Sequence, residues 1–175
     1  NLYFYLKDKK HKVKIFDNLL IKKNLKYLSI KDIIKCDLLK KIELEKKLKD
    51  FDIIINLAGQ TGVVPSNLNP LESIKKNIIG FLNLIEIAKK SKIKTIINAS
   101  TGGAIYGNSK KISNETDYSK PLSIYGLTKD FNEKMSKIIS NKIKIIHLRF
   151  SNVYGPYSIH KKSLIHNAIK SNILD

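Results

Sequence analysis

Tyr125 and Lys129 lie four residues apart in the segment PLSIYGLTKD, and their types and spacing suit acid–base chemistry. Residues i and i+4 share one face of a helix, so the phenol and the ammonium become neighbours when this segment is helical. A nearby ammonium stabilises a phenolate and lowers the pKa of the tyrosine from its ordinary value of about 10. A phenol tuned in this way takes or gives a proton near neutral pH. Because lysine is abundant in this chain, the pair alone also fits two unrelated surface residues.

The segments around this pair alternate between short apolar runs and longer amphipathic stretches. Strands are predicted over Lys12–Phe16, Ile33–Cys36, Phe51–Gly59, Lys94–Ser100 and Lys142–Phe150. Helices are predicted over Leu38–Leu48, over Asn69–Lys90, which Asn69 and Pro70 begin, and over Ile124–Ile139, which Ser123 caps. This order predicts an α/β fold, a doubly wound and mainly parallel sheet joined by right-handed crossovers.

Ligands of a doubly wound sheet bind beyond the carboxyl ends of the strands, so the residues that follow each strand are candidate site residues. Asp17 suits the ribose hydroxyls of a dinucleotide and repels a 2′-phosphate, which favours NAD over NADP. Asp17 and Asn18 together equally suit a simple turn. Asp37 suits either an adenine amino group or the N-cap of the helix that follows it.

Small and hydroxyl-bearing residues follow two further strands. The segment NLAGQTG lets the backbone approach a ligand closely, and the hydroxyls of Ser100 and Thr101 lie at the end of the next strand. Gly80 is costly inside a helix unless another residue packs against it, and Asn77 either braces a neighbouring strand or faces water. Together with the tyrosine–lysine pair, these groups are the parts that a nicotinamide–alcohol redox site needs.

The combination resembles the extended short-chain dehydrogenase/reductase family, in particular its nucleotide-sugar epimerases, from about Leu2 to Pro156. KIFDNL resembles the ribose-binding strand end of that family, CDL its adenine-contacting segment, and INLAGQTGV its HLAA-type segment. NIIGFLNLIEIA resembles the helix that carries a structural asparagine, here Asn77. ASTGGAIYG, YGLTK and LRFSNVYGP resemble the hydroxyl strand, the catalytic helix and the substrate-side loop.

The resemblance implies a Rossmann-type site for NAD, a nucleotide-sugar substrate and a homodimer of the full-length protein. It implies catalytic roles for Tyr125, Lys129 and Thr101. It implies cofactor contacts from Asp17, Asn18, Asp37, Leu38, Leu57, Ala58, Gly59, Gln60, Asn77, Ser100, Tyr125, Lys129 and Ser151. It implies substrate contacts from Thr101, Gly102, Tyr125 and Asn152.

Two departures from the family pattern bear on these expectations. The glycine-rich loop G-x-x-G-x-x-G and the first strand before it are absent from this sequence, so the strands that would flank that strand are expected to expose unpaired edges. Gly102 occupies the position of the usual catalytic serine or threonine, four residues before Tyr106. We therefore expect Thr101, in preference to Ser100 or water, to supply the catalytic hydroxyl.

The resemblance also separates the reactions of the family. Its dehydratases and decarboxylases carry acidic residues just before the VYG tyrosine, where this chain has Gly103 and Ala104. The expected function is therefore a 4-epimerase-like reaction, in which a sugar hydroxyl is oxidised to a ketone and reduced again. A nucleotide-sugar dehydratase or reductase, and a non-catalytic dinucleotide-binding module, remain alternatives.

Composition limits the partners. The formal charge of +18 comes almost entirely from scattered lysines, with Arg149 as the only arginine, so nucleic acid is not an expected partner. No apolar run approaches the roughly 20 residues that span a bilayer, so no membrane partner is expected either. The single cysteine, Cys36, fits a reducing compartment and a cytoplasmic location, and no metal is expected.

The chain opens within the pattern of a helix and lacks an initiator methionine, which predicts a fragment that is inactive by itself. We expect residues 1–156 to form a partial dinucleotide-binding domain. Residues 157–175 are expected to begin a small substrate-binding domain.

Overall fold

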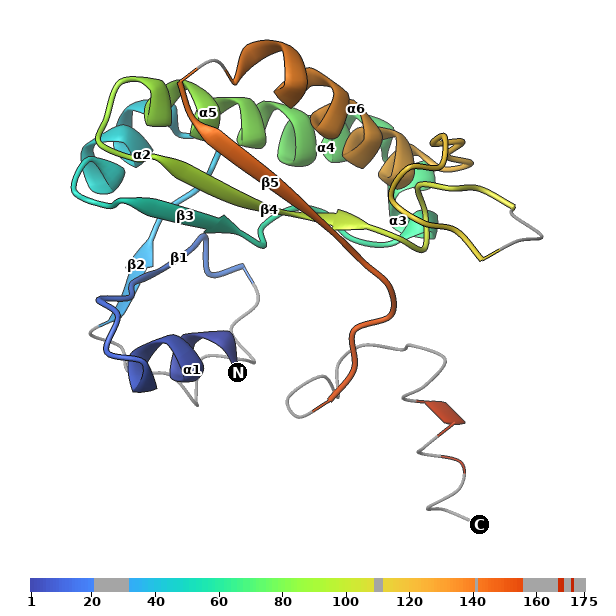
Figure 1. Ribbon diagram of the computed structural model, residues 1–175, viewed down its shortest axis with the longest axis horizontal. Coiled ribbons are helices and arrows are strands. Elements are labelled where there is room, and N and C mark those ends of the chain that lie inside the picture. Colours follow the sequence, from blue (N-terminus) through green and yellow to red (C-terminus); the bar gives the residue numbers. More distant parts are fainter. Residues whose placement is uncertain (21–31, 109–111, 141, 156–166, 169–170, 172–175) are drawn as a thin grey trace. The chain divides into compact units, whose positions relative to one another are not determined.

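The computed structural model describes residues 1–20, 32–108, 112–140, 142–155, 167–168 and 171 (Figure 1). The chain divides into two compact units, one of residues 1–36 and 152–175 and the other of residues 37–151. The predicted domain boundary after Pro156 lies outside the described residues and stays a prediction.

The first unit contains a pair of short parallel strands. Its elements are the helix α1 (Leu2–Asp8) and the strands β1 (Ile15–Asp17) and β2 (Ile33–Lys35). Ile15 is opposite Ile33, and the amide of Cys36 donates to the carbonyl of Asp17 at 2.9 Å just beyond the paired residues. Both predicted strands are confirmed, but β1 begins three residues later and ends one residue later than predicted, and β2 ends one residue earlier.

The second unit is built on a three-stranded parallel sheet in the order β3-β4-β5. The strands are β3 (Ile53–Asn56), β4 (Thr95–Thr101) and β5 (Lys144–Phe150), and the helices that precede and follow them include α2 (Lys41–Leu48) and α6 (Ile124–Ile139). The isoleucine-rich strands alternate with amphipathic helices, as the sequence predicts. Among the described residues, β3, β4 and β5 form one sheet and β1 and β2 another, and the expected unpaired edges stay a prediction.

The predicted helix over residues 69–90 is interrupted by a turn of π-helix. It consists of α4 (Pro70–Ile74), the π-helical turn η3 (Lys75–Ile79) and α5 (Gly80–Lys89). Asn69 caps its start by accepting from the amide of Glu72 at 3.4 Å. The predicted need for packing against Gly80 is met by Leu38, whose Cβ would lie 3.1 Å from a Cβ at that glycine. Figure 1 shows α5 and α6 along one face of the sheet.

A row of polar side chains crosses the apolar core at one level of the three strands. Asn56, Asn98 and His147 are opposite one another in register. Asn56 Nδ2 donates to Asn98 Oδ1 at 2.7 Å, and Asn98 Nδ2 lies 3.1 Å from His147 Nδ1. His147 Nε2 lies 2.9 Å from Ser136 Oγ on α6. Since the amide must donate to Nδ1, the imidazole carries its proton on Nε2, and burial lowers its pKa.

Candidate active site

The helix α6 begins where the sequence predicts, because Ser123 supplies its cap. Ser123 has an extended backbone, and its Oγ accepts from the amide of Gly126 at 3.1 Å. A Cβ at Gly126 would lie 2.3 Å from the carbonyl oxygen of Ala104. Only a glycine therefore lets the first turn of α6 approach the loop that follows β4.

The first turns of α6 bring Tyr125 and Lys129 together at the end of β4. Lys129 Nζ lies 5.8 Å from the centre of the Tyr125 ring and donates to the carbonyl of Ala99 at 2.8 Å. The lysine is only 5 % exposed, and burial lowers its pKa to about 8. The side chains predicted to be neighbours thus face one another beside the sheet.

Thr101 is the hydroxyl that contacts the phenol. It is buried at the end of β4, its Oγ1 accepts from the amide of Ala104 at 3.2 Å, and it is hydrogen-bonded to the Tyr125 side chain. Burial raises the pKa of Tyr125, and the bond from Thr101 offsets part of this rise. The predicted lowering of this pKa is therefore wrong, because desolvation of the phenol outweighs the hydrogen bond from Thr101.

Ser100 faces a different group. Its hydroxyl donates to the carboxylate of Glu133 on α6, which also pairs with Arg149, with 2.8 Å between Arg149 Nη2 and Glu133 Oε2. Burial acts to raise the pKa of Glu133, but the bonds from Arg149 and Ser100 bring it below its usual range. Arg149 also donates to the Tyr106 hydroxyl at 2.6 Å, so this tyrosine is engaged in the same cluster.

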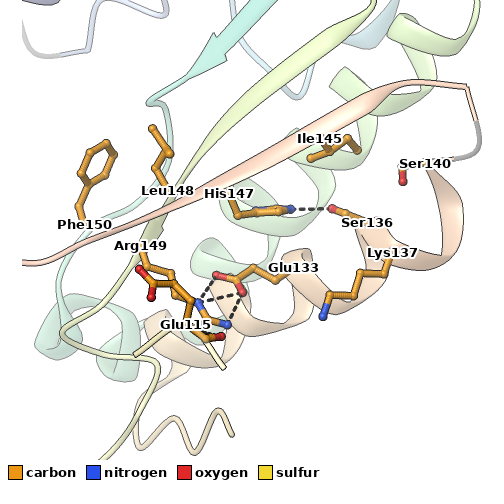
Figure 2. Close-up of a pocket in the computed structure, with 10 residues that line it drawn as sticks. All are labelled: Glu115, Glu133, Ser136, Lys137, Ser140, Ile145, His147, Leu148, Arg149 and Phe150. Carbon is orange, nitrogen blue, oxygen red and sulfur yellow. Dashed lines mark hydrogen bonds and ion pairs between the residues drawn. The ribbon is translucent and has the colours of Figure 1, made fainter. Parts of the chain in front are cut away.

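This cluster borders a cavity of about 560 Å³ between α6 and β5. Figure 2 shows Glu133 and Arg149 pointing toward one another, with His147 directed at Ser136 farther along the strand. Neither Tyr125 nor Lys129 lines this cavity. The candidate chemistry therefore lies at the end of β4 and outside the cavity.

The loop after β3 is held beside the pair by Asn77. Its Oδ1 accepts from the amide of Gln60 at 2.8 Å, and its Nδ2 donates to the carbonyl of Gln60 and to Thr128 Oγ1, both at 3.1 Å. Gly59 has a φ of 144°, and a Cβ there would lie 2.6 Å from Asn77 Oδ1 and 3.9 Å from Lys129 Nζ. Asn77 is buried and thus does not face water, and it joins this loop to α6 where the sequence predicted a brace to a neighbouring strand.

The arrangement leaves Lys129 with donors for a ligand that carries hydroxyl groups. An ammonium has three N–H donors, and among the described residues Ala99 is the one hydrogen-bond acceptor that Lys129 contacts. Two donors of a buried group are thus left for a ligand, and vicinal hydroxyls are suitable acceptors. Leu57, Ala58 and Gly59, which follow β3, are exposed beside them and offer an apolar surface and a close backbone.

The other predicted contact residues have mainly local partners. Asp37 Oδ1 accepts from the amide of Leu39 at 2.9 Å and does not cap α2, and the carbonyl of Leu38 accepts from Asn83 at 2.8 Å. The amide of Gly102 donates to the carbonyl of Phe150 at 2.6 Å, and Ser151 is exposed after β5.

Three of the predicted contact residues, Asp17, Asn18 and Asn152, belong to the first unit. There the side chain of Asp17 accepts from the amide of Leu19 at 2.7 Å.

The sequence interpretation missed two residues of the short helix α3 (Val63–Leu68) that contact α6. Ser66 Oγ accepts from the amide of Tyr125, and Asn67 Oδ1 accepts from the amide of Ile124, both at 3.0 Å. A serine and an asparagine in the polar run PSNLNP resemble ordinary loop residues, so the sequence carries no signal for these bonds.

Two further classes of feature are missing from the part of the chain that the structure describes. None of its helices is long and apolar enough to cross a membrane. It contains no group of three or more His, Cys, Asp or Glu side chains arranged to hold a metal ion.

Comparison with known proteins places this geometry in a family. The model of the NAD dependent epimerase/dehydratase family matches residues 1–174. Protein CapI of Staphylococcus aureus is 38% identical over 110 residues, which are 61% of this chain and 33% of that protein. UDP-glucose 4-epimerase of Thermotoga maritima, solved with UDP-glucose, is 31% identical with a TM-score of 0.81, and the match covers 89% of this chain and 52% of that one.

A third similar protein was solved with both ligands. It is a tyrosine-to-phenylalanine mutant of Bacillus cereus UDP-glucuronic acid 4-epimerase in complex with NAD and UDP-4-deoxy-4-fluoro-glucuronic acid. It is 27% identical with a TM-score of 0.84, over 99% of this chain and 58% of that one. The chain thus spans little more than half the length of these two solved structures and a third of CapI. With the α/β fold and the tyrosine–lysine pair, these matches show that the chain belongs to the NAD dependent epimerase/dehydratase family.

Proposed function

We propose that the complete protein containing this chain is an NAD-dependent nucleotide-sugar 4-epimerase. The observation that carries the proposal is the cluster at the end of β4. There the Tyr125 phenol is hydrogen-bonded to Thr101 and faces a lysine ammonium that is itself held by the Ala99 carbonyl. The similar solved structures, which are UDP-sugar 4-epimerases in complex with UDP-glucose or with NAD, support the same reaction class.

Each residue of the cluster has a separate role in one reversible proton transfer. When bound, NAD supplies the centre that accepts a hydride from the sugar and returns it. Tyr125 takes the proton of the sugar hydroxyl as the carbon is oxidised and gives it back on reduction. Thr101 donates to the phenol oxygen, which stabilises its negative charge, and Lys129 supplies positive charge beside the ring.

Burial decides when the phenol reacts. Because burial raises the pKa of Tyr125, the free chain keeps its phenol protonated at neutral pH. Loss of that proton needs added positive charge or a bound alcohol nearby. The tyrosine is thus set to act as a base only in the loaded site.

The surroundings of the cluster favour epimerisation over loss of water. Gly103 and Ala104, after β4, offer no proton donor. The buried carboxylate on the same helix, Glu133, is already bonded to Arg149 and Ser100. Elimination of a sugar hydroxyl needs an acid to protonate the leaving oxygen, and this carboxylate is ionised and engaged.

Incubating the complete protein with NAD and a panel of UDP-sugars tests the reaction class. Nuclear magnetic resonance of the products should show the 4-epimer, without a 4-keto-6-deoxy sugar and without net formation of NADH. Tyr125→Phe should lower the turnover at least about 100-fold while binding of the nucleotide sugar is retained. Full turnover by this variant would reject the acid–base assignment, whereas a dehydrated product would reject epimerisation alone.

We also propose that the complete protein is a homodimer in the cytoplasm. Leu127, Phe131 and Ile138 lie exposed at helical spacing on α6, which gives a second copy of this chain an apolar face to cover. Sedimentation equilibrium of the complete protein tests the dimer, and a monomer at micromolar concentration would reject it. The single cysteine, Cys36, supports the location, which cell fractionation tests.

A further inference from the structure

The first turn of α6 is held by side chains from two places in the sequence. The first four amides of a helix have no partner within it. Ser123 binds the amide of Gly126, as an ordinary cap does. The two amides before it, which belong to Ile124 and Tyr125, are bound by Asn67 and Ser66 of α3. The start of the helix therefore depends on a segment almost sixty residues earlier in the chain.

The hydroxyl of Ser66 is fixed by one hydrogen bond that it donates and one that it accepts. It donates to the carbonyl of Val63 at 2.7 Å and accepts from the amide of Tyr125 at 3.0 Å. The residue is 0 % exposed, so water does not compete for either bond. The serine consequently sets the distance between α3 and the backbone of Tyr125.

The same segment is joined to the loop after β3. Gln60 Nε2 donates to the carbonyl of Pro65 at 3.3 Å, and Asn77 binds the backbone of Gln60 on both sides. A continuous set of hydrogen bonds thus runs from this loop through α3 to the residue that carries the phenol. A shift of α3 moves Tyr125 relative to Thr101 and to any ligand on the loop.

We propose that Ser66 is a positioning residue, which holds the backbone of Tyr125 so that its phenol meets Thr101 and the sugar hydroxyl. This inference rests on the proposed function, because it assumes that Tyr125 transfers the proton. A misplacement of about 1 Å at a reacting group costs up to about 100-fold in rate. Losing one of the three hydrogen bonds to the amides of this turn should displace the phenol by less than about 1 Å.

The test compares turnover of the complete protein with and without the phenol. Ser66→Ala should lower kcat about tenfold and leave the KM for the nucleotide sugar within about twofold. In a Tyr125→Phe background the same substitution should change the residual rate by less than about twofold, since no phenol is left to position. Ser136→Ala, which removes a buried hydroxyl on α6 far from its first turn, should leave kcat within about twofold in both backgrounds.

Equal losses of rate with and without the phenol would overturn the inference, as would an equal effect of Ser136→Ala. Should Ser66→Ala fail to fold, Asn67→Ala decides, because Asn67 is exposed and binds the neighbouring amide. The same pattern in that variant supports the inference, and an unchanged kcat rejects it. Full turnover by Tyr125→Phe would instead reject the proposed function, so the two failures are distinguishable.

A second readout needs no turnover. Ultraviolet titration of the ligand-free protein, with its Tyr125→Phe variant subtracted, reports the pKa of this phenol alone. Ser66→Ala should raise this pKa further, because a displaced phenol loses the bond from Thr101 that lowers it. A pKa that does not move would show that Ser66 stabilises the fold without placing the phenol, and would overturn the inference.

Discussion

Replacing Lys129 with methionine should stabilise the fold at neutral pH while it removes activity. The pKa of this lysine falls from 10.5 to about 8 because its ammonium is buried. At about 1.36 kcal/mol for each pH unit, keeping the ammonium charged costs the fold about 3 kcal/mol at pH 7. Losing the bond from the charged Nζ to the carbonyl of Ala99 costs about 1.5 kcal/mol. Lys129→Met should therefore gain about 1.5 kcal/mol at pH 7.

The gain should disappear as the pH rises. Between pH 8 and 10.5 the unfolded chain holds the proton of Lys129 more often than the folded chain does, so the stability of the natural protein increases with pH. At pH 9.5 about 1 kcal/mol of the charging cost remains, which the lost bond to Ala99 cancels. The variant and the natural protein should then be about equally stable.

Urea unfolding of the complete, ligand-free protein at several values of pH from 7 to 9.5 measures this difference. Lys137→Met serves as the control, because Lys137 is an exposed lysine on the same helix. A Lys129→Met variant that is less stable at pH 7, or whose advantage does not shrink toward pH 9.5, would refute the reasoning. A confirmed gain would show that the lysine is kept at a cost in stability, as expected of a functional group.

The remaining predictions concern the groups around the phenol. Thr101→Val should lower kcat at least about tenfold, because the Tyr125 phenol loses its hydrogen-bond donor, whereas Ser100→Ala should cost about 1 kcal/mol of stability with kcat nearly unchanged. Steady-state rates and urea unfolding of both variants check this, and equal rate losses would contradict the separate roles. Gly126→Ala should destabilise the fold by about 1–3 kcal/mol, because its Cβ would meet the carbonyl of Ala104 at 2.3 Å, and a variant as stable as the natural protein would contradict this packing.

The sequence predicts those parts of the fold that depend on local patterns. The bounds of α6 follow from its apolar spacing and from the cap at Ser123, and the observed helix keeps those bounds. The π-helical turn η3 has no such signal. There the carbonyl of Asn77 accepts from Asn132 of another helix at 2.8 Å, and a partner of this kind appears only once the chain has folded. The helix α3 is short and contains Pro65, so its pattern resembles a loop.

The candidate site shows the same division. The facing of Tyr125 and Lys129 follows from a spacing of four on a helix, which the sequence displays directly. The choice between Ser100 and Thr101 does not follow, because successive residues of a strand point to opposite faces and the sequence does not say which face meets the phenol. The predicted direction of the shift in the Tyr125 pKa is wrong for a related reason. The shift depends on burial of the phenol, which depends on the packing of the whole unit.

The polar row of Asn56, Asn98 and His147 has a consequence for the fidelity of folding. The strands that carry it are nearly interchangeable runs of isoleucine, and sliding one past another by two residues keeps every side chain on its own side. Apolar contacts between the strands therefore discriminate poorly between the native strand register and a register shifted by two residues. A shift of β3 or β5 relative to β4 separates Asn98 from the amide of Asn56 or from the imidazole of His147. A buried polar group left without a hydrogen-bond partner costs about 1–3 kcal/mol of folding free energy. The three polar residues thus disfavour shifted strand registers that the isoleucine contacts alone would tolerate.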